Sequence, residues 1–141
     1  MIREWTRGDF TISTDPRRLD LDAIHRFLVR SYWAEGIPRD VMERSIANSL
    51  PFGLYERSEQ VGFARVVSDL ATYAYLTDVI VAETARRQGI GSWMVEAILS
   101  HPDLQGLRRV ALYTRDAQAL YERYGFSTDR PASVYMELRA R

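Results

Sequence analysis

The chain has 141 residues, of which 46% are hydrophobic, 27% charged and 11% aromatic. This length and balance are typical of one folded domain, so we predict a single domain over residues 1–141. Its 19 basic and 19 acidic side chains cancel, which argues against nucleic acid or an anionic membrane as the main partner, because such partners require a basic excess.

Cysteine and lysine are both absent from the sequence. Disulfides, thiolate metal sites and cysteine nucleophiles are thereby excluded, as are a P-loop lysine and a Schiff-base lysine. His25 and His101 are far apart, and no HExxH or GxSxG motif occurs, so we expect neither a metal site nor a serine hydrolase. No run reaches the 18 or so apolar residues of a membrane span, and the N-terminus has no signal-peptide pattern, so we expect a cytoplasmic protein.

The first half of the chain predicts one strand and a pair of helices. Residues 10–14 have strand composition and end at Asp15-Pro16. A helix follows from an N-cap at Asp20 or Asp22, with an apolar stripe of Ile24, Phe27, Leu28 and Tyr32. Gly36 and Pro38 end it, and a second helix is indicated by the helical spacing of Val41, Met42, Ile46 and Leu50.

The second half predicts a meander followed by an alternation of helices and strands. Residues 52–55 and 60–67 form a hairpin, and 73–81 is a long strand rich in aromatic and β-branched residues. The remaining elements are a loop at 82–91, a helix ending near residue 100, a strand at 109–114, a helix at 117–124 closed by Gly125, and a strand at about 133–139.

The predicted order is β-αα-β-β-β-α-β-α-β. The connection from residues 73–81 through one helix to 109–114 is long enough for a parallel βαβ unit. We therefore predict an α/β (α+β) fold with a mixed, mostly antiparallel sheet and helices on both faces.

The strongest functional signal is the segment VIVAETARRQGIGS at residues 79–92. A strand leads into a loop whose Gly89 and Gly91 let a ligand approach the backbone, and a helix begins there with unpaired amide groups. With Arg86 and Arg87 beside the helix dipole, this pattern favours a phosphate or pyrophosphate ligand. An ordinary βα turn and a Rossmann dinucleotide site are the alternatives, but the third small residue and the acidic residue of the Rossmann fingerprint are missing.

The pattern R-x-x-G-x-G at Arg86, Gly89 and Gly91 resembles the acetyl-CoA motif of the GNAT superfamily of N-acetyltransferases. The segment AQALYERYGF at residues 117–126 is similar to that family's A-x-x-L-Y-x-x-x-G-F segment and follows in the expected order. The resemblance implies an acyl-CoA N-acyltransferase-like fold and acetyl-CoA as co-substrate.

The resemblance also implies which residues bind the cofactor. The main chain of residues 79–81 would bind the pantetheine arm as an added strand, where a bulge splays two strands apart. The expected contacts are Val79, Ile80, Val81, Arg86, Arg87, Gln88, Gly89, Ile90, Gly91, Ser92, Thr114 and Ala117, although at Thr114 the family often has Asn.

Two residues are candidates for catalysis. Tyr121 resembles the family's general acid, which protonates the departing thiolate; its alternative role is that of a core aromatic residue. Asp78 lies mid-strand between apolar residues, where a carboxylate is either a general base or the partner of an arginine such as Arg65.

The acceptor is expected to lie beneath the region that joins the two predicted helices. Tyr32 and Trp33 could stack on an amine, or could instead close the core at a helix end. Arg65 and Tyr75 are further candidate walls of the acceptor site.

The predicted activity is acetyl transfer to a primary amine of a small molecule or peptide by direct attack in a ternary complex. A non-catalytic acyl-CoA-binding or sensor domain of the same fold is the alternative. A homodimer stays open, because the strand predicted near 133–139 could pair with its own sheet or with a second chain.

Overall fold

The computed structural model describes residues 1–129 and 133–140, apart from the side chain of Arg87. Six strands form one sheet in sequence order: β1 (Glu4–Arg7), β2 (Phe10–Ser13), β3 (Leu50–Glu56), β4 (Glu59–Ser68), β5 (Tyr73–Val81) and β6 (Arg109–Leu112). Neighbouring strands are antiparallel except β5 and β6, which are parallel. The predicted mixed, mostly antiparallel sheet and its βαβ unit are confirmed.

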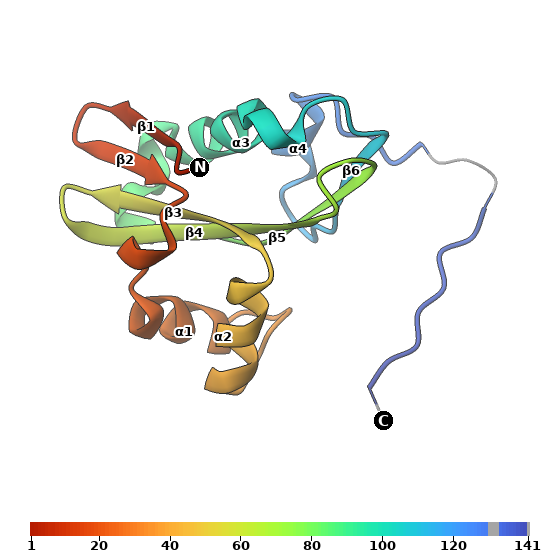
Figure 1. Cartoon of the computed structure of the whole chain (residues 1–141), viewed down its shortest axis with the longest axis horizontal. Coiled ribbons are helices and arrows are strands. Elements are labelled where there is room, and N and C mark those ends of the chain that lie inside the picture. The colour runs from red at the N-terminus through yellow and green to blue at the C-terminus, as the bar shows by residue number, and fades with distance from the viewer. Residues whose placement is uncertain (130–132, 141) are drawn as a thin grey trace.

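Helices cover both faces of the sheet (Figure 1). On one face lie α1 (Leu21–Val29) and α2 (Arg39–Ala47), and on the other lie α3 (Ile90–Ser100) and α4 (Gln118–Glu122). Short 3-10 turns occur at Pro16–Arg18, Glu83–Gln88 and Pro102–Leu104. None of the described helices has the length and apolar character needed to cross a bilayer.

The sheet separates two apolar clusters, one beneath each helical layer. The larger joins β2–β6 to α3 and includes Phe52, Leu54, Met94 and Ile98. The smaller joins α1 and α2 to the sheet through Ile24, Leu28, Met42, Ile46 and Phe63. The four helical residues among them belong to the stripes whose spacing predicted the first two helices, because burying such a stripe on the sheet stabilises a short helix that would be marginal alone.

Helix α1 begins as predicted, with the Asp20 side chain accepting a hydrogen bond of 3.0 Å from the Ala23 amide. It ends at Val29, three residues before Tyr32, so the prediction that Tyr32 continues the apolar stripe is wrong. The Ser31 amide already turns back to the Leu28 carbonyl at 3.0 Å, and Tyr32 is 49% exposed.

Five other features differ from what the sequence predicts. Strand β1 was not predicted, because only Trp5 among its four residues is even half-buried. The expected loop at 82–91 contains the 3-10 helix Glu83–Gln88, strand β6 ends at Leu112, and Leu50 belongs to β3 rather than to α2. No strand forms within residues 133–140, which extend away from the sheet with Val134, Met136 and Leu138 more than four-fifths exposed (Figure 1).

Candidate active site

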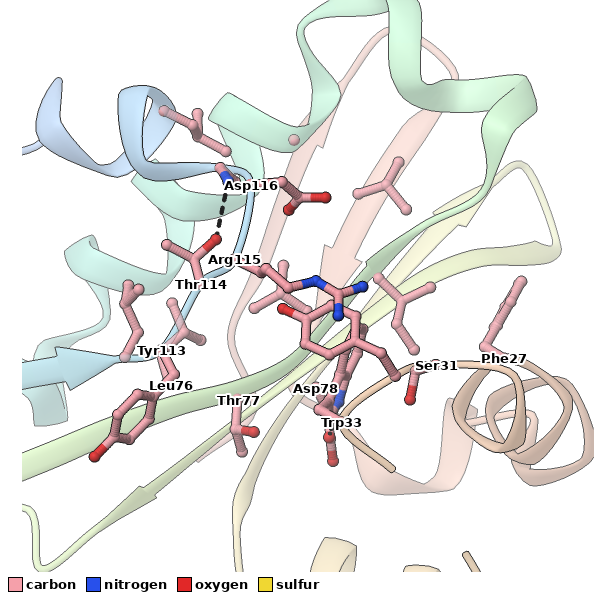
Figure 2. A pocket seen from close by; sticks show the side chains of 18 of the residues that line it. Phe27, Ser31, Trp33, Leu76, Thr77, Asp78, Tyr113, Thr114, Arg115 and Asp116 are labelled. Atoms are coloured by element: carbon pink, nitrogen blue, oxygen red, sulfur yellow. Dashed lines mark hydrogen bonds between the residues drawn. The ribbon is translucent and has the colours of Figure 1, made fainter. Parts of the chain in front are cut away.

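A cavity of about 1230 Å³ opens between the two helical layers. Its floor is the second half of β5, and its walls are the end of α1 with the loop after it, the loop between β6 and α4, and α4 itself (Figure 2). Segments far apart in the sequence thus meet at one place, where strand pairing between β5 and β6 ends.

The second half of β5 has a free edge on the cavity side. Strand β5 pairs with β6 only from Tyr73 to Leu76, whereas residues 77–81 line the cavity. On its other side β5 pairs with β4, but between the pairs Arg65–Thr77 and Phe63–Ile80 it contains one residue more than β4. This is the predicted bulge, and it leaves backbone amide and carbonyl groups of β5 available to an added extended ligand.

Asp78 forms the bulge and is nearly buried. Its φ is +55°, a conformation that Asp tolerates better than most residues. The side chain is 6% exposed, its Oδ2 accepts 2.6 Å from Arg65 Nε, and its Oδ1 accepts 2.8 Å from Trp33 Nε1. The expected ion pair with Arg65 is therefore confirmed, whereas the role of Asp78 as a base is a prediction that its two donors do not favour.

Helix α3 points its N-terminus toward one end of the cavity. Its N-cap, Gly89, has φ +69° and offers no side chain to the first amides. A Cβ placed on Gly91 would meet no atom within 4 Å, and Gly91 lines the cavity. Packing within the chain therefore does not require glycine at position 91, and the free space there fits a ligand phosphate approaching the unpaired amides.

Arg86 stands between this helix and the free edge. Its Nε donates 2.7 Å to the Val81 carbonyl, and its Nη1 lies 3.9 Å from Glu83 Oε1. The side chain is mostly exposed, so it can leave the Val81 carbonyl without disturbing the core.

The predicted cofactor contacts divide into two groups. Those that line the cavity are Val79, Ile80, Val81, Arg86, Gly91, Thr114 and Ala117. Gln88, Gly89, Ile90 and Ser92 are not among the lining residues: Ile90 is core, 2% exposed, and Ser92 Oγ accepts 3.2 Å from Arg123. The side chain of Arg87 lies outside what the structure describes. Because an amide can reach a ligand while its side chain packs elsewhere, a backbone role for residues 88–92 stays a prediction.

Thr114 has a structural contact of its own. Its hydroxyl accepts 3.0 Å from the Ala117 amide at the start of α4, as the dashed line in Figure 2 shows. This contact closes the turn that leads into α4, which carries Tyr121.

Tyr121 belongs both to the core and to the cavity wall. It is 7% exposed, packs edge-on against Phe126 with ring centroids 5.7 Å apart, and also lines the cavity. Burial, with a smaller contribution from Tyr32, raises the pKa of Tyr121 above its usual value. The phenol therefore stays protonated and is available as a proton donor.

Three of the four predicted acceptor residues line the cavity: Tyr32, Trp33 and Tyr75. The Tyr32 and Trp33 rings meet edge to face at 5.0 Å, and Tyr75 meets Tyr113 at 6.0 Å. Arg65 does not line the cavity and acts there only through Asp78.

Sequence reasoning missed several lining residues: Phe27 as a wall residue, Arg30, Thr77, Tyr113 and Arg115. Arg115 has the clearest contact, with its guanidinium carbon 3.8 Å from the centre of the Tyr32 ring. Arg115 could have been predicted from its position just beyond a strand, because loops at strand ends often carry binding residues. Its contact with Tyr32, 83 positions earlier in the chain, could not have been predicted from the sequence.

The part of the chain that the structure describes contains no group of three or more His, Asp or Glu side chains that could hold a metal ion. The uncapped start of α3 and the free edge of β5 would suit a long ligand that carries phosphate at one end. The fold and cavity together define an acyl-CoA N-acyltransferase-like protein.

Comparison with known proteins leads to the same family. Residues 47–128 match the model of the acetyltransferase (GNAT) domain. A Gibberella zeae protein named as an acetyltransferase, FG08082, is 36% identical over 84% of this chain and 79% of its own length. The chain belongs to the GNAT acetyltransferase family.

Solved structures support the fold. A crystal structure of a GNAT-family acetyltransferase from Xanthomonas campestris has a TM-score of 0.89 and 45% identity, covering 93% of both chains. A Clostridium acetobutylicum acetyltransferase structure with acetyl-CoA has a TM-score of 0.64 and 14% identity over 97% of this chain and 95% of its own, and so shows likeness of fold.

A second sequence relative is similar over part of the chain only. The Saccharomyces cerevisiae protein named D-amino-acid N-acetyltransferase is 30% identical over 53% of this chain, which spans 52% of that protein.

Proposed function

We propose that this protein is an acetyl-CoA-dependent N-acetyltransferase that acetylates a primary amine of a small molecule or peptide in a ternary complex. One observation carries the proposal: the free edge of β5 runs along a cavity between the N-terminus of α3 and the wall that contains Tyr121. A ligand with a phosphate at one end and a reactive group further along could use all three features at once.

Residues of this chain fit each part of acetyl-CoA. The amides at the start of α3, with Gly91 leaving room beside them, would bind the pyrophosphate. Arg86 would leave the Val81 carbonyl to pair with a phosphate, which frees that carbonyl for the pantetheine arm. When bound, acetyl-CoA supplies the acetyl group as an activated thioester.

The cavity residues supply the rest of the chemistry. Backbone N–H groups of the β5 segment around Ile80 and Val81 would stabilise negative charge on the acetyl oxygen. The Tyr121 hydroxyl holds a proton at the wall and would donate it to the departing sulfur. In the balanced transfer a C–N bond forms, the C–S bond breaks, and the amine loses one proton while the thiolate gains one.

Asp78 is assigned a positioning role in this proposal. Both of its oxygens accept hydrogen bonds, from Arg65 and from Trp33, and so tie β5 to β4 and to the loop after α1. The amine would then enter in its neutral form or lose its proton to water.

The first experiment is thermal unfolding with acetyl-CoA, CoA and NAD, because a ligand that binds the native state raises the melting temperature. We expect a rise with acetyl-CoA and CoA and none with NAD. Thiol release is then measured with an amine panel for the wild type and Tyr121→Phe. Binding of acetyl-CoA without turnover of any amine would instead support the non-catalytic sensor.

The choice of acceptors is guided by the yeast relative, which is named a D-amino-acid N-acetyltransferase. For this reason the amine panel begins with small amines rather than peptides.

A further inference from the structure

The acceptor end of the cavity is aromatic, and the cavity lining as a whole contains several arginines. Along β5, in the direction away from α3, the cavity lining continues through Asp78, Thr77 and Tyr75. Tyr32 and Trp33, from the loop after α1, line the same part of the cavity. Arg26, Arg30 and Arg115 line the cavity as well. Figure 2 shows Arg115 reaching from the loop before α4 across the opening toward the loop that carries Ser31 and Trp33.

The negative charge nearest this end is already compensated. Arg65 pairs with Asp78 at 2.6 Å, and that arginine is outside the cavity lining. The lining has two further acidic residues: Glu83, which lies 3.9 Å from Arg86, and Asp116, which lies beside Arg115 on the same loop. Among the described residues, Arg26, Arg30 and Arg115 form no ion pair within 4.0 Å. The cavity lining therefore has more unpaired positive than unpaired negative charge, and Arg115 brings part of it to the acceptor end.

Arg115 is held in place by an aromatic platform. Its guanidinium carbon lies 3.8 Å from the centre of the Tyr32 ring, and Tyr32 packs edge-on against Trp33. Trp33 is in turn fixed by its hydrogen bond to Asp78. A guanidinium stacked by its face keeps its N–H groups free at the rim, in the planar fork that matches a carboxylate.

A simple amine is a poor match for such a site. It is a cation in water, and three unpaired arginines disfavour its approach unless the molecule also carries negative charge. We propose that Arg115 binds the carboxylate of the acceptor, so that the substrate is a primary amine bearing a carboxylate. This inference rests on the proposed function and makes Arg115 a residue that determines specificity.

The test uses matched acceptors that differ only in the anionic group. Phenylalanine, phenylalaninamide and phenethylamine share a side chain that suits the aromatic walls, and leucine with isopentylamine forms a second pair. Both enantiomers of each amino acid are used. For the wild type we expect kcat/KM for at least one amino acid to exceed that for its decarboxylated partner by about tenfold or more, the size of one charge-assisted hydrogen bond. The phosphonate analogue of phenylalanine shows whether the site accepts any anion or favours a carboxylate.

The variants then assign the preference to a residue. Arg115→Ala should lower the ratio of amino acid to decarboxylated amine by about tenfold to a hundredfold, mainly through KM. Arg115→Lys keeps the charge but not the fork and should have an intermediate ratio. Arg57→Ala, which removes an exposed arginine that pairs with Asp9 and does not line the cavity, is the matched control and should leave the ratio unchanged.

Each outcome decides between the two proposals. Equal or better use of the decarboxylated amines, or a ratio that does not respond to Arg115→Ala, overturns the inference while the acetyltransferase stands. If acetyl-CoA raises the melting temperature but none of these amines is acetylated, the inference is also overturned. No effect of acetyl-CoA on the melting temperature defeats the proposed function itself.

Discussion

The indole Nε1 of Trp33 donates a hydrogen bond of 2.8 Å to Oδ1 of Asp78, 45 positions later in the chain. This hydrogen bond connects the loop after α1, which forms one wall of the cavity, to the bulge of β5, which forms its floor. Because Asp78 also pairs with Arg65 on β4, a change at any of the three residues is expected to affect both the sheet and the acceptor end.

Asp78→Asn separates positioning from base catalysis. Asparagine tolerates φ +55° and can still accept from Trp33, so the substitution removes chiefly the charge opposite the mostly buried Arg65. Removing one partner of a buried pair costs about 3–5 kcal/mol, and the 17% exposure of Arg65 reduces this to about 2–3 kcal/mol. Denaturant unfolding measures the loss of stability. Unchanged stability combined with a kcat about a hundredfold lower would instead identify Asp78 as a base.

Trp33→Phe keeps a ring at the cavity wall and removes the donor to Asp78. We expect KM for the amine to rise several-fold, because the platform under Arg115 is no longer fixed, with little change in the affinity for acetyl-CoA. A double-mutant cycle with Asp78→Asn measures the coupling. Strictly additive effects would show that the hydrogen bond does not link the wall to the floor.

Tyr121→Phe removes the proposed proton donor. We expect kcat to fall about 10²- to 10⁴-fold, with unchanged acetyl-CoA binding by calorimetry. Tyr55→Phe is a matched control, because the buried Tyr55 hydroxyl has no hydrogen-bond partner among the described residues. Full activity of Tyr121→Phe would assign Tyr121 to the core alone.

The pH profile offers a second test of Tyr121. Burial raises its pKa above the usual value of a tyrosine, so the protonated form persists at higher pH. No alkaline decline of kcat is therefore expected below about pH 10, the ordinary tyrosine pKa. A decline in kcat between pH 8 and 9, at roughly the pKa of a thiol, would point to a different acid.

Gly91→Ala should change stability and ligand binding in opposite directions. The new Cβ meets nothing within 4 Å, and alanine favours a helix over glycine by up to about 1 kcal/mol, so the melting temperature should be unchanged or higher. The methyl group would occupy the space assigned to the pyrophosphate, so acetyl-CoA affinity should fall about tenfold or more. Glu96→Ala, on the exposed side of the same helix, is the control. Undiminished affinity in Gly91→Ala would remove the phosphate site from this helix terminus.

His101 should make stability fall in mild acid. It is 2% exposed, its Nδ1 accepts from the Asp103 amide, and burial lowers its pKa below the usual 6.5. The neutral form is favoured by folding, so its contribution is complete above pH 6.5 and is lost as the pH falls toward the lowered value. Melting temperatures from pH 7.5 to 5 should show a shallower decline for His101→Asn than for the wild type. Parallel curves would contradict this assignment.

Local sequence patterns were enough to predict the order of the main elements and a phosphate-bearing ligand. Helical stripes such as Ile24, Leu28, Met42 and Ile46, and the β-branched run of residues 73–81, are local patterns imposed by burial on one face. The strand–glycine–helix segment at 79–92 is equally local, because unpaired amides at a helix start attract anions in any fold.

Only the tertiary structure decided which side chains share the cavity. The bulge at Asp78, the arginine opposite it and the indole of Trp33 depend on strand register and on where α1 ends, and neither is encoded in a short window. The stack of Arg115 on Tyr32 likewise joins residues that the chain separates by four strands. Contacts of this kind arise because the sheet brings distant loops to one edge, so the nature of the acceptor is read from the fold rather than from a motif.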